Sequence, residues 1–171
     1  MRSLRLLSAA AELAGHFGAR VSDEHTRAGH TAAVTGAARR LATDGIGMLA
    51  LPGDIPLVEA ADIRRLLAAH RPAPAFTIAP AHDELGSNAV LCTPADAVAL
   101  RFGDNSFFPH LAAARTRGIE PSVLQLPRIA LDIDTPDDLA RFLAIPSRTH
   151  ARALLDRWGV CADGVKDEVR A

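Results

Sequence analysis

The sequence lacks the features that mark several large classes of protein. It has two cysteines, Cys92 and Cys161, which form neither a disulfide framework nor a C-x-x-C metal motif. Its formal net charge is −1, without the excess of positive charge that binds nucleic acid or anionic lipid. No apolar run reaches the ~20 residues that a membrane-spanning helix needs. We therefore expect a cytoplasmic protein with reduced thiols that binds neither nucleic acid nor a membrane.

Length and composition predict one domain. The 171 residues are 49% hydrophobic, which is typical of a globular chain with a sizeable core. The start, MRSLRLLSAAAELAGHFG, resembles a short signal peptide, but Glu12 interrupts its apolar centre and its leucines and alanines fit a helical stripe. We expect residues 1–171 to form a single domain, with residues 160–171 as a polar, flexible tail.

Helical and strand-like segments alternate, which favours an α/β sandwich with a mostly parallel sheet. Helices are expected over residues 4–16, 31–42, 59–70, 106–117 and 148–158, and another is expected to begin at Pro136 with Thr135 as its cap. Strands are expected over residues 19–21, 45–51, 76–79, 89–92, 98–102, 122–126 and 128–133.

Asp54 follows the apolar segment GIGMLAL and precedes Pro56. In open α/β sheets, ligands bind outside the carboxyl ends of the strands, so Asp54 is a candidate ligand of a metal or phosphate. The alternative is a loop aspartate that forms an Asx-turn.

A second candidate lies in RIALDIDTPDDL, residues 128–139. If this segment begins as a strand, Asp132 and Asp134 share one face. Two adjacent carboxylates repel unless a cation or a proton lies between them, and Mg²⁺ prefers such oxygen ligands. The alternative is that Asp132 pairs with an arginine and Asp134 merely precedes the helix cap.

The loop HDELGSNAV, residues 82–90, offers groups that suit an anion. Gly86 permits a tight or left-handed turn, and Ser87 and Asn88 supply short hydrogen-bonding side chains beside backbone N–H groups. A plain polar loop between strands is the alternative.

The segment RFGDNSFFPHLAAARTRG, residues 101–118, contains a further candidate. Gly103 opens a loop, and Asn105 or Ser106 is expected to cap a helix whose N-terminus favours anions. The alternative is a capped helix with no ligand. His110, inside this helix, is expected to be a surface or packing histidine rather than a base.

Taken together, LPGDIPL, HDELGSNAV, FGDNSFFPHLAAA and LDIDTPDDL resemble four motifs of the CofC/FbiD-type guanylyltransferases of coenzyme F(420) biosynthesis, in the family's order over residues 49–139. The resemblance implies a Rossmann-like nucleotidyltransferase fold of the nucleotide-diphospho-sugar transferase type, a three-layer sandwich. It also implies transfer of GMP from GTP to a three-carbon phospho-acid, with release of pyrophosphate. The acid would be phosphoenolpyruvate, 2-phospho-L-lactate or 3-phospho-D-glycerate.

The resemblance also implies roles for individual residues. Asp54, Asp132 and Asp134 would be the catalytic residues that carry Mg²⁺. The residues that would hold the phospho-acid are Gly86, Ser87 (threonine in the usual motif), Asn88, Gly103 and Ser106.

The chain departs from the family pattern near its N-terminus. Family members usually begin with a strand and a Lys-x-Arg-Leu loop that handles the triphosphate, whereas the only lysine here is Lys166. GHTAAV, residues 29–34, resembles the family's G-L-N-A-A-x with His30 and Thr31 substituted, and Asn105 stands where glycine is usual. We expect an N-terminally truncated fold whose uncovered sheet edge promotes a homodimer.

Three functions therefore stay open. The first is an active guanylyltransferase. The second is a non-catalytic truncated homologue or partner subunit that binds phospho-acid or metal. The third is a molybdopterin or sugar-nucleotide transferase on the same fold, because a fold does not fix a function.

Overall fold

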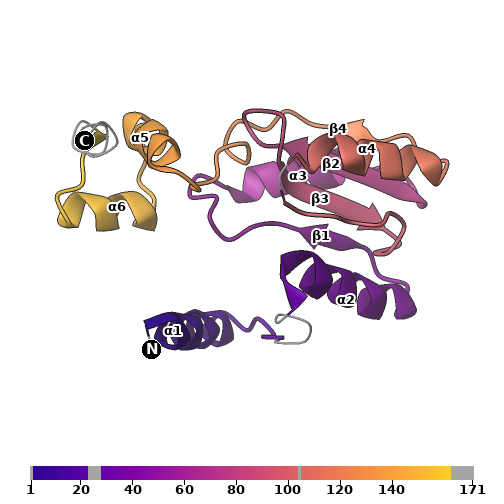
Figure 1. The fold of residues 1–171 in the computed structure, drawn as a ribbon, viewed down its shortest axis with the longest axis horizontal. Coiled ribbons are helices and arrows are strands. Elements are labelled where there is room, and N and C mark those ends of the chain that lie inside the picture. The colour runs from indigo at the N-terminus through magenta and orange to yellow at the C-terminus, as the bar shows by residue number, and fades with distance from the viewer. Residues whose placement is uncertain (1, 23–27, 104, 163–171) are drawn as a thin grey trace.

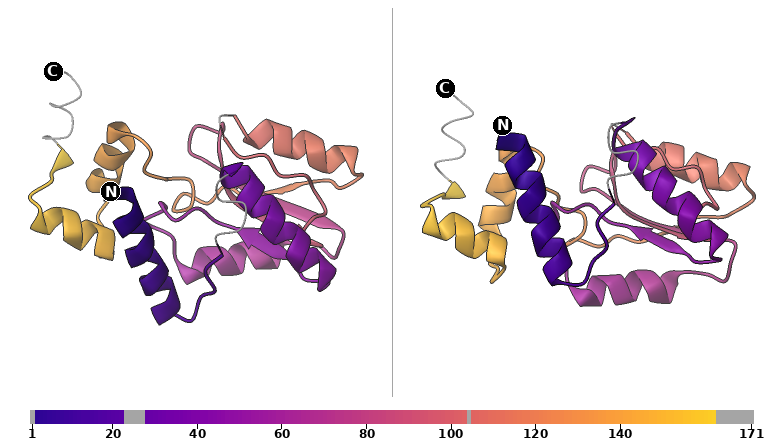
Figure 2. Two further views of the ribbon diagram at one scale, coloured as in Figure 1. Left: turned by 60° about the horizontal axis from the view of Figure 1, so that its bottom comes forward. Right: turned by 90° about the horizontal axis from the view of Figure 1, so that it is seen from below.

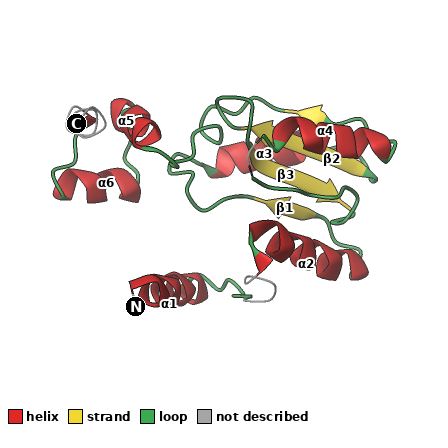
Figure 3. Ribbon diagram, in the orientation of Figure 1, coloured by secondary structure: helices red, strands yellow, loops and turns green. Residues whose placement is uncertain are grey.

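The computed structural model describes residues 2–22, 28–103 and 105–162 (Figure 1). Figure 3 separates the helices from the strands by colour. In chain order the elements are α1 (Arg2–His16), α2 (His30–Thr43), β1 (Met48–Ala50), α3 (Ala60–Ala69), β2 (Ala75–Pro80), β3 (Ser87–Thr93), α4 (Phe107–Thr116), β4 (Ser122–Val123), α5 (Pro136–Ala144) and α6 (His150–Arg157).

The sheet has the strand order β1-β3-β2-β4. β3 is antiparallel to both β1 and β2, and β4 is parallel to β2. The expectation of mostly parallel pairing is therefore wrong for the described residues. The cause is the short connection between β2 and β3: a parallel pair needs a crossover of a dozen or more residues, whereas a short loop returns the chain antiparallel.

Helices cover both faces of the sheet, which confirms the three-layer α/β sandwich (Figure 2). Side chains of α2 and α4 share one core cluster with Phe76 and Ile78 of β2. Ala79, which points to the opposite face of β2, belongs to a second cluster with Leu66 of α3. A third cluster joins α5 and α6 around Phe142.

All six expected helices are present, each within a few residues of its expected bounds. Thr135 caps α5 as expected: its hydroxyl accepts a hydrogen bond from the Asp138 backbone N–H at 3.3 Å.

Three expected strands, over residues 19–21, 98–102 and 128–133, are irregular segments instead. In the last of these, the backbone N–H groups of Ile129 and Ala130 both donate to the Leu126 carbonyl, at 2.9 and 2.8 Å. Their donors are thus satisfied within a turn, and no sheet ladder is needed to satisfy them.

Some expectations stay untested. Residues 163–171 of the expected tail, Lys166 included, lie outside the described residues. The single domain over residues 1–171 and the homodimer stay predictions. In the part of the chain that the structure describes, no helix is long and apolar enough to cross a membrane.

Candidate functional site

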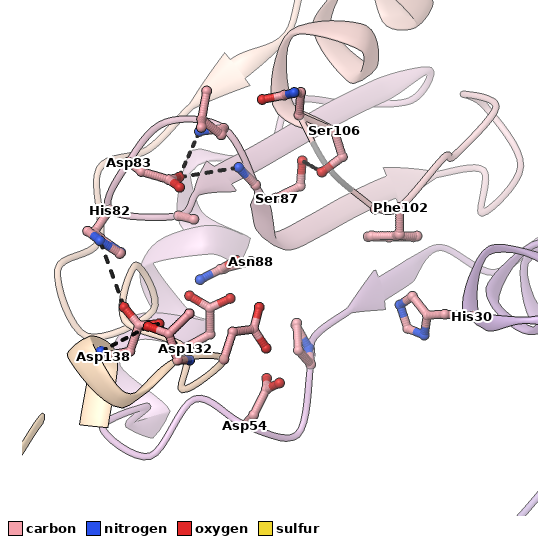
Figure 4. A pocket seen from close by; sticks show the side chains of 18 of the residues that line it. His30, Asp54, His82, Asp83, Ser87, Asn88, Phe102, Ser106, Asp132 and Asp138 are labelled. Atoms are coloured by element: carbon pink, nitrogen blue, oxygen red, sulfur yellow. Dashed lines mark hydrogen bonds and ion pairs between the residues drawn. The ribbon is translucent and has the colours of Figure 1, made fainter. Parts of the chain in front are cut away.

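A cavity of about 790 Å³ brings the predicted residues together (Figure 4). Its lining contains all eight of them: Asp54, Gly86, Ser87, Asn88, Gly103, Ser106, Asp132 and Asp134. They come from four segments: the loop after β1, the start of β3, the loop that leads into α4, and the segment before α5. The alternative readings, in which each segment is a separate loop or cap, do not predict this convergence.

One wall of the cavity is acidic. The Ile133 backbone N–H donates to the Asp54 carbonyl at 3.1 Å, which ties the loop after β1 to the segment that carries Asp132 and Asp134. The pKa of Asp134 is raised, first by burial and then by repulsion from the carboxylates of Asp132, Asp54 and Asp138. The carboxylates thus lie close enough to repel one another.

The local alternatives for Asp54 and Asp132 are not observed. The carboxylates of Asp54 and Asp132 make no hydrogen bond or ion pair with any described residue. Asp54 therefore forms no Asx-turn, and Asp132 does not pair with an arginine.

The donors of the acidic wall fit Mg²⁺ by their chemistry. No group of three or more His, Cys, Asp or Glu side chains among the described residues is arranged to hold a metal ion by itself. Mg²⁺, however, is usually held by one or two carboxylates together with substrate phosphates, and it keeps several waters. The metal role of Asp54, Asp132 and Asp134 stays a prediction that depends on a bound phosphate.

The charge of the lining also suggests that metal and phosphate would bind together. Arg141 is the one Arg or Lys side chain among the lining residues. The same lining contains the carboxylates of Asp54, Asp83, Asp132, Asp134, Asp137 and Asp138. A phosphate would be repelled here unless a cation accompanied it.

The other wall presents hydroxyl groups (Figure 4). Ser106 occupies the N-cap position of α4 but makes no capping hydrogen bond. Its hydroxyl instead donates to Ser87 Oγ at 3.0 Å, and both residues are buried. The expectation that the Ser106 side chain caps the helix is therefore wrong. Its backbone is already helical, with φ −73° and ψ −22°, instead of extended as in a capping residue, and its hydroxyl is directed at Ser87 on β3.

His110 lies next to Ser87 and forms the buried support of this wall. Its Nδ1 lies 2.9 Å from Ser87 Oγ, and its Nε2 accepts from the Arg101 backbone N–H at 2.9 Å. The ring is only 1% exposed, and burial lowers the pKa of His110 to about 4. His110 packs against Phe102 as a packing histidine would, but it also contacts a site residue. The four-residue spacing from Ser106, on one helix face, is the sequence signal that could have identified it.

Gly86, in the loop between β2 and β3, is favoured by close packing and not by the left-handed turn that we expected. The residue with positive φ in this loop is Glu84, at 58°, and not Gly86. A Cβ at position 86 would lie 3.2 Å from the Ala81 Cβ, so glycine is favoured there by close packing. Asn88 is anchored by its amide, which donates to the Ile129 carbonyl at 3.0 Å.

The loop before α4 is held by the N-terminus of α2. Thr31 Oγ1 donates to the Phe102 carbonyl at 3.2 Å and accepts from the Phe102 backbone N–H at 3.0 Å. The His30 ring lies edge-on to the Phe102 ring at 4.9 Å. Gly103 follows with φ of 124°, a conformation that favours glycine. The segment at residues 29–34 thus supports the site, and its resemblance to G-L-N-A-A-x was the signal.

Residues 15–167 match the family described as "Guanylyl transferase CofC like". The chain belongs to this family. The match covers all four segments of the cavity lining.

Curated relatives carry three different substrate names. The chain is 42% identical over 117 residues to a phosphoenolpyruvate guanylyltransferase of Rubrobacter xylanophilus, covering 68% of this chain and 57% of that protein. It is 42% identical over 129 residues to a 3-phospho-D-glycerate guanylyltransferase of Colwellia psychrerythraea, covering 75% and 60%. It is 41% identical over 104 residues to a 2-phospho-L-lactate guanylyltransferase of Methanothermobacter thermautotrophicus, covering 61% and 45%. The matches span only about half of each relative.

A solved structure supports the fold. A putative nucleotide-diphospho-sugar transferase from Desulfovibrio desulfuricans G20 superposes with a TM-score of 0.59, over 85% of this chain and 64% of that chain, at 19% identity. The expected nucleotide-diphospho-sugar transferase type of fold is thus confirmed.

Proposed function

We propose that this chain transfers GMP from GTP to a three-carbon phospho-acid and releases pyrophosphate, in the biosynthesis of coenzyme F(420). Phosphoenolpyruvate is the acceptor we favour, with 2-phospho-L-lactate and 3-phospho-D-glycerate as the alternatives. The observation that carries the proposal is the convergence of the four family-like segments on one cavity.

The cavity has the two kinds of surface that this reaction needs. The acceptor brings a carboxylate and a phosphate. The hydroxyl wall offers an anion the hydroxyl of Ser87, because the hydroxyl of Ser106 is used in donating to Ser87. The acidic wall suits phosphates only when a cation lies between, and bound Mg²⁺ would neutralise the charge of the triphosphate and polarise the α-phosphate.

The residues of this chain would act by position. An acceptor phosphate oxygen attacks the α-phosphorus of GTP, a P–O bond forms, and the bond to pyrophosphate breaks. No side chain is needed as a covalent nucleophile, so orientation and charge neutralisation supply the rate enhancement. Asp54, Asp132 and Asp134 would hold the metal, and Ser87, Gly103 and Ser106 would orient the acid.

The test is pyrophosphate release by the purified 171-residue chain with GTP and Mg²⁺, with each of the three acids offered in turn. Release with one acid supports the proposal and names the acceptor. If an acid binds by calorimetry but no pyrophosphate appears with any of them, the chain is a binding homologue and the proposed transfer is wrong.

A further inference from the structure

Ser87 Oγ is the centre of a buried hydrogen-bond network. It accepts from the Ser106 hydroxyl at 3.0 Å and lies 2.9 Å from His110 Nδ1. Ser87, Ser106 and His110 are 6%, 4% and 1% exposed, so water has little access to rearrange the network. The direction of each hydrogen bond therefore decides what Ser87 offers to the cavity.

The tautomer of His110 follows from its second contact. The Arg101 backbone N–H can only donate, so Nε2, which lies 2.9 Å away, must be the unprotonated acceptor. A neutral imidazole with unprotonated Nε2 carries its proton on Nδ1. Nδ1–H therefore donates to Ser87 Oγ. The lowered pKa of His110 agrees with a neutral ring.

Both acceptor positions of Ser87 Oγ are then filled by donors. The hydroxyl hydrogen of Ser87 cannot point at Ser106 or at His110, because each of them already donates to it. No acceptor for this hydrogen is found among the residues that the structure describes. The remaining direction is the cavity that Ser87 lines.

We propose that His110 is a positioning residue that fixes Ser87 as a hydrogen-bond donor to an anionic oxygen of the acceptor acid. This inference rests on the proposed function, since it assumes that a phospho-acid enters the cavity. A serine without such neighbours can rotate and present its lone pairs, which would repel a carboxylate. With its two acceptor positions occupied, Ser87 presents only a donor, and a hydrogen bond from it to a charged oxygen is among the stronger kinds.

The tautomer is tested on the wild-type protein. Nitrogen chemical shifts of the His110 ring, assigned with a His110→Asn control, should show a protonated Nδ1 and an unprotonated Nε2 at pH 7. A proton on Nε2 would overturn the inference whatever the chain binds.

Two variants of His110 each keep one of the two hydrogen bonds of its ring and lose the other. In His110→Asn, the side-chain amide takes the place of Nδ1–H and keeps the donor to Ser87. In His110→Gln, the longer side chain reaches the Arg101 N–H and gives up the donor to Ser87. Binding of phosphoenolpyruvate with Mg²⁺ should weaken about tenfold in the Gln variant and less than about threefold in the Asn variant. A purely structural role for His110 gives no reason for the Asn variant to bind better, so equal or reversed losses would overturn the inference.

A coupling measurement separates positioning from general damage. Ser87→Ala alone should weaken phosphoenolpyruvate binding about tenfold, and adding His110→Gln to it should weaken binding by no more than about twofold further. Independent, multiplicative losses would overturn the inference. If wild-type protein binds none of phosphoenolpyruvate, 2-phospho-L-lactate and 3-phospho-D-glycerate, the inference is wrong. If it binds but releases no pyrophosphate, only the proposed transfer is wrong.

Discussion

Thr31→Val tests whether the N-terminus of α2 holds the loop that leads to the hydroxyl wall. The substitution keeps the shape of the side chain and removes the hydroxyl that makes two hydrogen bonds with the Phe102 backbone, at 3.2 and 3.0 Å. Those bonds join residues 71 positions apart. Their loss should release the loop at Phe102 and Gly103 without creating a cavity.

The magnitude follows from the two lost bonds. A neutral hydrogen bond contributes about 1 kcal/mol to stability, and both bonds are partly buried, so water can replace them in part. We expect the free energy of unfolding to fall by about 1–2 kcal/mol. For a domain of this size that lowers the melting temperature by roughly 2–8 °C.

The assay combines thermal unfolding with kinetics. In Thr31→Val the KM for phosphoenolpyruvate should rise more than the KM for GTP, because the loop carries Gly103, which would help to hold the phospho-acid. Thr116→Val is the matched control: its hydroxyl donates only to Ala112 of its own helix, at 2.9 Å, and is exposed. If Thr31→Val unfolds and turns over like the control, the reasoning about the loop is refuted.

Three further predictions concern charge. Asp132→Asn should abolish Mg²⁺-dependent pyrophosphate release while the circular dichroism spectrum stays unchanged; undiminished activity would contradict the metal role. Arg141→Gln should raise the KM for GTP about tenfold if this guanidinium contacts phosphate oxygens, and an unchanged KM would place the phosphates elsewhere. Burial lowers the pKa of His70 below its usual value of 6.5, so the folded protein disfavours its protonated form. The contribution of neutral His70 to the free energy of unfolding is therefore complete above pH 6.5. It is lost as the pH falls through the lower pKa that His70 has in the folded state. Chemical denaturation at pH 7.5 and 5.5 should show a smaller loss of stability in His70→Gln than in the wild type.

Local patterns predicted the helices well. The Thr135 cap, Pro136 and the acidic first turn act within four residues of chain, and α5 begins where they indicate. The buried strands β2 and β3 were also found, because their apolar runs are bounded by turn residues. In these cases the sequence neighbours supply the interactions that decide the structure.

Partners distant in sequence decided what local patterns could not. The apolar run before Asp132 looks like a strand, yet the Ile129 carbonyl accepts from the Asn88 side chain, 41 residues earlier, and the Ala130 carbonyl accepts from the His82 backbone N–H. Ser106 has the residue type and position of a cap, yet its hydroxyl bonds to Ser87 on β3, 19 residues earlier in the chain. His110 looked like a packing histidine, because the contact that gives it a further role lies on another element. Spacing along the chain does not report which side chain will lie opposite.

The arrangement of the cavity follows from backbone contacts at both walls. The Ile133 N–H to Asp54 carbonyl bond fixes the acidic wall, and the Phe107 N–H to Leu85 carbonyl bond, at 2.9 Å, fixes the start of α4 beside the loop that precedes Ser87. Because both walls are anchored by backbone atoms, the carboxylates of Asp54 and Asp132 are not needed to hold the walls in place. A molecule with a carboxylate at one end and a phosphate at the other matches one wall with each end. The carboxylate needs the hydroxyl donor of Ser87, and the phosphate needs a cation beside the aspartates. The site should therefore bind the acid in one orientation, with its phosphate toward Asp54 and Asp132.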